Sequence, residues 1–330
     1  MVDTDDGGKI VQLAAAIAER STRHRLTEQD VRRAEDRLLP HLRYTPLLQT
    51  WLTRTDGSQL KVSIKLENLQ IAESFAVRGV LNAALTLPHK EVARGLVGYG
   101  RTHGAAVAYT AHVLQVPAVV YLFERVATEE FQRSLEAWGA TVVLQGQTRA
   151  EARTAAAAHA ERDRLMMILP TSPGFIAGCA TIALEILEFA PEVSVFVTAV
   201  GFGTLVTGMA LYAHLVKPDI RVIGVDRIPN DRAIVPLNGR DRTHRFPIGT
   251  LLEHAGPAVR SQVERHADAV ILVTEAEARH ASQRLWSEME VRTGGSGSAA
   301  IAALLSSRAP INEGEEVAAV ISTSGDEGLF

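Results

Sequence analysis

The chain has 330 residues, of which 46% are hydrophobic and 22% are charged, with a formal net charge of −4. This length favours two lobes, and the composition is typical of a globular protein with a large core. The weak charge and the lack of a basic cluster exclude a nucleic-acid partner. The single cysteine, Cys179, excludes an internal disulfide and a multi-cysteine metal site, so no metal is expected.

The first residues are acidic and lack the basic-then-apolar order of a signal peptide. No apolar run approaches the length of a membrane span. We therefore expect a soluble cytoplasmic protein with no membrane partner.

Periodicity predicts two amphipathic helices, at residues 9–20 and 27–39. The second begins with Thr27-Glu28-Gln29-Asp30, which resembles a capping box, and Pro40 ends its pattern. Four apolar residues share one face of it: Val31, Ala34, Leu38 and Leu39. Residues 60–66 alternate as in a strand, and residues 78–87 return to helical spacing.

From residue 95 onward, short apolar strands alternate with helices, which predicts a parallel sheet buried on both faces. We expect a first, compact lobe with four strands, at 95–98, 117–122, 141–144 and 166–169, and helices at 103–114, 128–138 and 149–164. A second set has strands at 193–200, 220–225, 269–274 and 316–322, and helices at 180–189, 205–216, 275–290 and 296–307. Residues 228–268 are predicted to be a surface excursion. The domains expected are a large lobe, 1–96 plus 178–330, and a small lobe, 97–177.

Several short motifs occur in a fixed order along the chain. They are Thr45-Pro46-Leu47, Lys65-Leu66-Glu67-Asn68, Ser74-Phe75-Ala76-Val77-Arg78-Gly79, Gly201-Phe202-Gly203-Thr204 and Ser322-Thr323-Ser324-Gly325-Asp326. Together they resemble the signatures of the fold-type II pyridoxal-phosphate enzymes, which include threonine and serine dehydratases, cysteine synthase and tryptophan synthase beta-like proteins. The resemblance implies an α/β fold of two lobes and three αβα layers with parallel sheets, a lyase-like activity and a homodimer.

Position 76 departs from the family pattern in a way that bears on the chemistry. The resemblance implies that the central residue of this motif is a lysine that holds the cofactor as a Schiff base and moves the substrate proton, and this chain has Ala76. Alanine has no amine, so no covalently bound cofactor is expected. Only five lysines occur, namely Lys9, Lys61, Lys65, Lys90 and Lys217. Lys65 is the one near the motif, and we expect it to form an ion pair with Glu67 or a neighbour.

The resemblance also implies a set of residues around the cofactor position: Ser74, Ala76, Arg78, Thr102, Gly201, Phe202, Gly203, Thr204 and Thr323. Independently of the family, a glycine turn between a strand and a helix favours the binding of an anion, because backbone N–H groups converge there. In the segment Tyr99-Gly100-Arg101-Thr102-His103, the first, third and fourth residues replace a serine, a glycine and an asparagine of the family. The pocket is therefore predicted to be rebuilt.

Four residues are candidates for catalysis. His103 is the natural acid or base at neutral pH, and Arg101 can clamp a carboxylate or phosphate. Tyr99 can donate a hydrogen bond. Cys179 begins a predicted helix, where a thiol becomes more acidic, although a small core residue is the alternative interpretation. These groups suit proton transfer, elimination or cyclisation on an anionic small molecule, either amino-acid-like or phosphorylated.

Three interpretations remain open. The first is a remodelled enzyme that works without lysine-bound pyridoxal phosphate. The second is a pyridoxal-phosphate lyase of the serine or threonine dehydratase kind, in which Ala76 replaces the lysine. The third is a non-catalytic homologue that binds a metabolite or partner, which a cleft plugged by Tyr99, Phe123 and Phe202 would favour.

Overall fold

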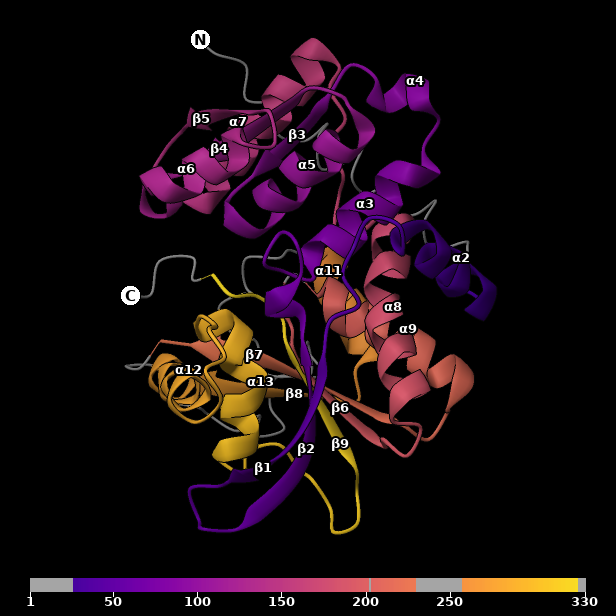
Figure 1. The fold of residues 1–330 in the computed structure, drawn as a ribbon, viewed down its shortest axis with the longest axis vertical. Helices are drawn as coiled ribbons and strands as arrows, with labels where there is room; N and C mark the ends of the chain where they lie inside the picture. Colours follow the sequence, from indigo (N-terminus) through magenta and orange to yellow (C-terminus); the bar gives the residue numbers. More distant parts are fainter. Residues whose placement is uncertain (1–25, 202, 230–256, 326–330) are drawn as a thin grey trace.

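The computed structural model describes residues 26–201, 203–229 and 257–325. The predicted helix at 9–20, Phe202, Asp326 and most of the excursion at 228–268 lie outside these residues. The described chain forms two lobes, each built on its own sheet (Figure 1). In the described residues, no helix is both long and apolar enough to cross a membrane.

The larger sheet has six strands in the order β1-β2-β9-β6-β7-β8. Their bounds are β1 Leu47–Thr53, β2 Gln59–Leu66, β6 Val195–Ala199, β7 Arg221–Ile228, β8 Ala269–Thr274 and β9 Val317–Ile321. All neighbours pair in parallel except β1, which runs antiparallel to β2 at the edge. The prediction of mostly parallel sheets is confirmed.

Helices cover both faces of this sheet, which makes three layers (Figure 1). One face packs under α12 (Glu275–Met289) and α13 (Gly295–Leu305), and the other under α8 (Pro173–Phe189) and α9 (Thr204–Val216). The alternation along β6 produces this arrangement, because Val195 and Val197 belong to the core beneath α13 whereas Phe196 belongs to the core beneath α8 and α9. On the α8 side lie also α2 (Glu28–Leu38) and α11 (Pro257–His266).

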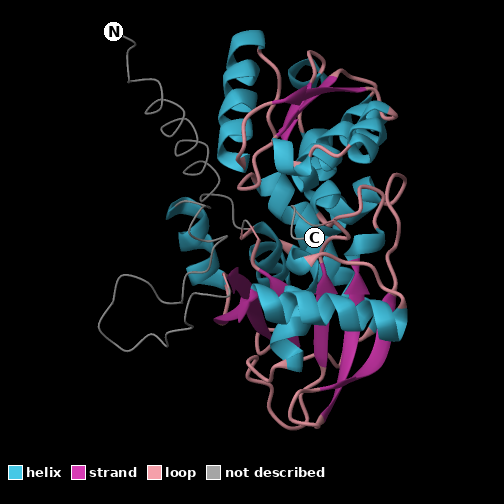
Figure 2. Cartoon of the chain, turned by 90° about the vertical axis from the view of Figure 1, so that its left-hand side faces the viewer, coloured by secondary structure: helices cyan, strands magenta, loops and turns pink. Residues whose placement is uncertain are grey.

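The smaller sheet has three parallel strands in the order β3-β4-β5, with helices around it (Figure 2). The elements are β3 Leu96–Tyr99, β4 Ala118–Leu122, β5 Ala140–Leu144, α5 Arg101–Leu114, α6 Glu129–Glu136 and α7 Arg149–Asp163. The predicted fourth strand is wrong, since residues 166–169 contribute only an isolated bridge between Met166 and Leu96. Short turns of helix complete the chain: η1 Glu67–Leu69, α4 His89–Val92 and η2 Glu124–Val126.

Helix α3 (Ala76–Thr86) joins the two lobes, because it packs on α8 and on α5. The approach of α3 to α8 is close at Gly178, where an added Cβ would collide with the carbonyl oxygen of Arg78. A glycine there lets the two backbones touch, and this contact sets the position of the first turn of α3. Ala76 begins that turn, so its place relative to both lobes is fixed by packing.

Two predicted helix starts can be compared with the structure. The capping box of α2 is confirmed, with Thr27 and Asp30 bonded reciprocally. The predicted helix extends to residue 39, whereas α2 ends at Leu38 and the Leu39 side chain is exposed. Helix α8 starts at Pro173, capped by the Ser172 hydroxyl, and not at residue 180. The excursion also contains α11, which the sequence pattern did not indicate.

Candidate functional site

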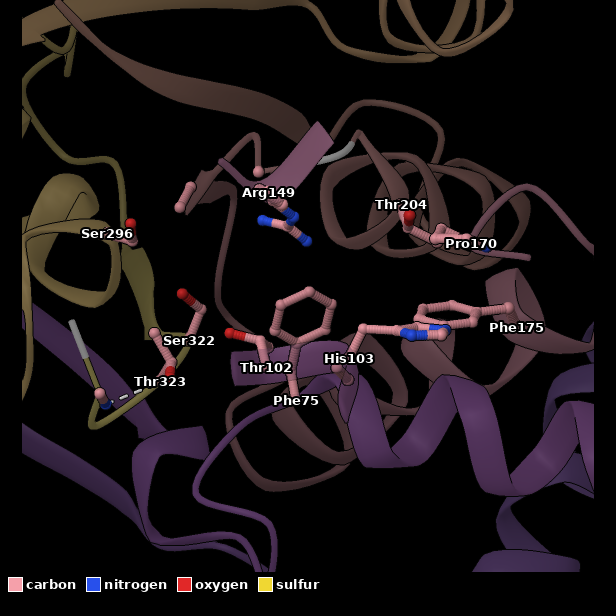
Figure 3. Close-up of a pocket in the computed structure, with 14 residues that line it drawn as sticks. Phe75, Thr102, His103, Arg149, Pro170, Phe175, Thr204, Ser296, Ser322 and Thr323 are labelled. Carbon is pink, nitrogen blue, oxygen red and sulfur yellow. Dashed lines mark hydrogen bonds between the residues drawn. The ribbon is translucent and has the colours of Figure 1, made fainter. Parts of the chain in front are cut away.

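A pocket lies between the lobes, at the carboxyl ends of β3, β6 and β9. It holds about 750 Å³ of empty space, its open mouth included. The residues that line it are Phe75, Ala76, Thr102, His103, Arg149, Pro170, Phe175, Ala199, Gly201, Thr204, Ser296, Ser322, Thr323 and Gly325 (Figure 3). Ligands of open α/β sheets bind at this end of parallel strands, so the position suits a binding site.

The pocket brings together some of the predicted site residues and leaves others outside. Those that line it are Ala76, Thr102, His103, Gly201, Thr204 and Thr323. Those that do not are Ser74, Arg78, Tyr99, Arg101, Cys179 and Gly203. Phe202 lies outside the described residues.

Ala76 occupies the wall of the pocket at the start of α3. Its backbone N–H donates to the Ser74 hydroxyl, and the Phe75 N–H donates to the Ser322 carbonyl oxygen, so the turn before α3 is tied to the end of β9. Among the described residues, no lysine lines the pocket. The wall therefore offers no amine at the family's lysine position or near it.

The described lysines lie outside the pocket, and three of them form ion pairs or hydrogen bonds there. Lys65 is buried, and its Nζ lies 2.5 Å from the Glu185 carboxylate, which bears out the predicted ion pair and identifies the partner. Lys61 pairs with Glu316 at the surface, and Lys217 donates to two backbone carbonyl oxygens. Lys90 is exposed on α4, and Lys9 lies outside the described residues.

His103 is the titratable group in the wall that is neutral at pH 7. Burial lowers the pKa of its imidazole to about 4, with the charges of Arg149 and Arg153 acting in the same direction. Its Nε2 lies 2.9 Å from the Ile168 carbonyl oxygen, and its Nδ1 is buried without a partner among the described residues. The Tyr99 ring packs against the imidazole at a tilt of 35°, with centroids 4.8 Å apart, so Tyr99 supports His103 from outside the pocket wall.

The guanidinium in the pocket comes from Arg149 and not from Arg101. Arg101 lies over the Phe131 ring at 4.3 Å and 3.7 Å from the Glu73 carboxylate. Its guanidinium packs against Gly325 of the lining but does not itself line the pocket. Arg149 begins α7, just after β5, and its side chain reaches into the space between Thr102, Ser322 and Thr204 (Figure 3). Its Cζ lies 5.6 Å from the Tyr99 ring. The cation that lines the pocket is thus a residue that the sequence analysis missed.

The remaining polar groups in the wall favour an anion. Helices α5, α9 and α13 each begin at the pocket after a glycine N-cap, and none has a side-chain cap. Their first-turn N–H groups and helix dipoles attract negative charge. At α13, Ser296 Oγ accepts a hydrogen bond from the Arg227 guanidinium at 2.9 Å. Among the described lining residues, Arg149 carries a charge of the same sign as these helix N-termini.

Cys179 is a core residue and not a pocket residue. It lies in the second turn of α8, because the helix begins at Pro173, so the predicted N-terminal effect on the thiol is absent. Burial raises the pKa of this thiol well above its ordinary value. The geometry therefore favours the interpretation as a small buried side chain.

This burial leads to a direct expectation for thiol chemistry. Cys179 is the only cysteine in the chain, so any reaction with a chromogenic disulfide reagent reports on it alone. We expect almost no reaction in the folded protein and a fast reaction once denaturant exposes the thiol, because only the thiolate is reactive. Rapid labelling without denaturant would contradict this placement.

Arg78 was predicted to contact the cofactor, but it belongs to a buried ion cluster behind Ala76. Its guanidinium contacts the carboxylates of Glu67 and Glu185. Burial opposes the charged form of Glu67, but Arg78 outweighs this effect and keeps the carboxyl pKa below its ordinary value. Arg78 thus holds the start of α3 in place without facing the pocket.

Two of the three aromatic residues considered above do not plug the pocket. Tyr99 and Phe123 are buried in the core of the small lobe and do not line it, and Phe202 lies outside the described residues. The aromatic side chains that do line it, Phe75 and Phe175, form apolar walls around open space (Figure 3). The described geometry thus gives no support to a plugged cleft.

Comparisons with known proteins agree with this architecture. The sequence profile of the family described as pyridoxal-phosphate dependent enzyme matches residues 38–323, which is most of the chain. The chain belongs to this family. A relative in it, the catabolic L-threonine dehydratase of Staphylococcus aureus, is 29% identical over 310 residues, covering 91% of this chain and 89% of the relative.

Solved structures show the same fold. Maize serine racemase is 22% identical, with a TM-score of 0.76, and the match covers 92% of this chain and 94% of that one. Threonine deaminase isoform 2 of Solanum lycopersicum is 23% identical, with a TM-score of 0.72 and 91% of each chain covered. The predicted family and fold class are confirmed.

Proposed function

We propose that this chain binds and converts an anionic small molecule in the pocket between its lobes, without a lysine-bound pyridoxal phosphate. One observation carries the proposal. The family's lysine position is Ala76, whereas the cation that lines the wall is Arg149, which is always charged and cannot form a Schiff base. A planar guanidinium suits bidentate binding of a carboxylate or phosphate.

The family's cofactor fits this pocket only in part. The turn at Gly201, the start of α9 at Thr204 and the hydroxyls of Ser322 and Thr323 suit a phosphate and a ring nitrogen. The amine that would bind the cofactor covalently has no described counterpart. A lyase of the threonine dehydratase kind with non-covalently held pyridoxal phosphate is the second candidate, and family membership together with these hydroxyls favours it.

His103 is the group we assign to proton transfer. Its low pKa makes it a weak base, mainly because of burial and in part because of the Arg149 charge. An anion bound at Arg149 would neutralise that charge and raise the pKa of the imidazole toward neutrality. The base would then be strengthened by the ligand itself, which suits elimination or cyclisation better than removal of an unactivated α-proton.

The absence of the amine can be tested on the intact protein. We expect pyridoxal phosphate to give no internal-aldimine absorption band, and borohydride reduction to leave no stoichiometric adduct by mass spectrometry. Ala76→Lys restores the amine and should produce both signals, whereas Ala76→Met, of similar length, should produce neither. An adduct on a native lysine would overturn the proposal. A tight non-covalent complex would favour the second candidate.

A further inference from the structure

The Ser296 hydroxyl has a fixed direction of hydrogen bonding at the wall of the pocket. Its Oγ accepts a hydrogen bond from Arg227 Nη2 at 2.9 Å. A guanidinium has no acceptor, so Ser296 cannot be the donor in this bond and keeps its own hydroxyl hydrogen for another partner. No described residue accepts that hydrogen, and Ser296 lines the pocket. The hydroxyl is therefore available to donate to a ligand.

Arg227 strengthens this donor from behind the wall. It lies on β7, does not line the pocket, and in the described part of the chain its Nε and Nη1 are buried without a hydrogen-bond partner. Its guanidinium is always charged, and by donating to Ser296 Oγ it draws electron density from the O–H group. A polarised hydroxyl prefers an anionic acceptor, because such a hydrogen bond is about twice as strong as one between neutral groups.

The helix that carries Ser296 has the same preference. Ser296 is the second residue of α13, so its backbone N–H has no acceptor within the helix. The dipole of α13 also favours negative charge at this end. Side chain, backbone and helix thus favour an anionic oxygen at one place, on the large-lobe wall of the pocket (Figure 3).

We propose that the ligand of this pocket carries a second acidic group, which accepts a hydrogen bond from the Ser296 hydroxyl, and that Arg227 is the positioning residue for this bond. The inference rests on the proposed function, in which the first acidic group binds Arg149 on α7 of the small lobe. The two anchors belong to different lobes, so a ligand with an acidic group at each end spans the pocket. The apolar walls at Phe75 and Phe175 accept the carbon chain between these groups.

Calorimetric titration with matched acids tests the second group. Malonate, succinate and glutarate are compared with propionate, butyrate and pentanoate, which have the same carbon chains and one acidic group. 3-Phosphonopropionate, compared with butyrate, provides the phosphate arm. We expect at least one diacid to bind about tenfold more tightly than its monoacid. The monoamide of that diacid, a neutral acceptor of the same length, should gain less than about threefold.

Substitution at position 296 attributes the gain. Ser296→Ala should abolish the difference between diacid and monoacid while the monoacid still binds. Ser306→Ala, at the other end of α13 and outside the lining, should preserve that difference.

A second pair of variants tests Arg227. Arg227→Met should reduce the gain of the diacid, and Arg227→Lys, which keeps a charged donor, should restore part of it. A merely structural role would lower the affinity of diacid and monoacid alike and leave their ratio unchanged. If Arg227→Met fails to fold, Arg227→Lys and the acid series on Ser296→Ala decide the question.

The outcomes separate this inference from the proposed function. Equal affinity of every diacid and its monoacid, an equal gain with the monoamide, or a gain that survives Ser296→Ala would overturn the second acidic group while leaving anion binding intact. An unchanged ratio in the Arg227 variants would remove the positioning role. Failure of every acid to bind would instead remove the proposed function.

Discussion

Replacing Arg149 by glutamine should weaken the binding of small carboxylates and phosphates by on the order of 100-fold. The guanidinium lines the pocket, so glutamine removes the fixed charge and the bidentate donor pair together. Truncating one partner of a desolvated charge pair costs about 2–5 kcal/mol, and 1.4 kcal/mol corresponds to a factor of ten. Titration of propionate and inorganic phosphate into the variant measures the loss.

Arg153 provides a matched control one turn further along α7. It is exposed and outside the lining, so Arg153→Gln makes the same change of charge at nearly the same place in the fold. We expect it to lower affinity by less than about threefold, because solvent screens an exposed charge. Equal losses of affinity in both variants would show that the ligand responds only to the total positive charge of the small lobe. Arg149 would then make no direct contact with the ligand.

Most of the architecture could be predicted from the pattern of apolar residues. Strands such as β6 and β9 are short apolar runs buried on both faces, and the helices between them repeat with clear spacing. The start of α8 was missed, although Ser172 followed by Pro173 is a recognisable helix beginning. The segment at 166–169 has the composition of a strand, but it forms only one bridge, between Met166 and Leu96 of β3. Strand pairing depends on the path of the chain beside β3, and composition does not determine that path.

The candidate site could be predicted less completely, because motifs do not say which way a side chain points. The family resemblance indicated Ala76 and Thr323, and the chemistry of imidazole indicated His103, and all three line the pocket. Arg78 and Arg101 belong to the same motifs and do not line the pocket. Arg149 was missed although a signal existed: it begins the helix that follows β5 after a four-residue loop, and residues after parallel strands gather at the carboxyl edge of a sheet.

The buried ion cluster behind Ala76 should be the most sensitive place in the large lobe. Lys65 and Arg78 both contact Glu185 at 2.5 Å, and Arg78 also contacts Glu67 at 2.8 Å. All four side chains are at most 5% exposed, so two cations balance two carboxylates away from water. Glu185→Ala leaves a net buried positive charge. We expect it to lower the free energy of unfolding by about 3–5 kcal/mol.

Glu188 lies one turn away on α8 and provides an exposed ion pair for comparison with the buried cluster. It pairs with Arg32 at 3.1 Å, but both side chains are about half exposed. Glu188→Ala should therefore cost less than about 1 kcal/mol. Denaturant unfolding of both variants and the unsubstituted protein gives the comparison from midpoints and slopes. If the two variants lose similar stability, the cluster is not held by its charges. A selective loss with Glu185→Ala would show that these charges fix the start of α3, and with it the wall that contains Ala76.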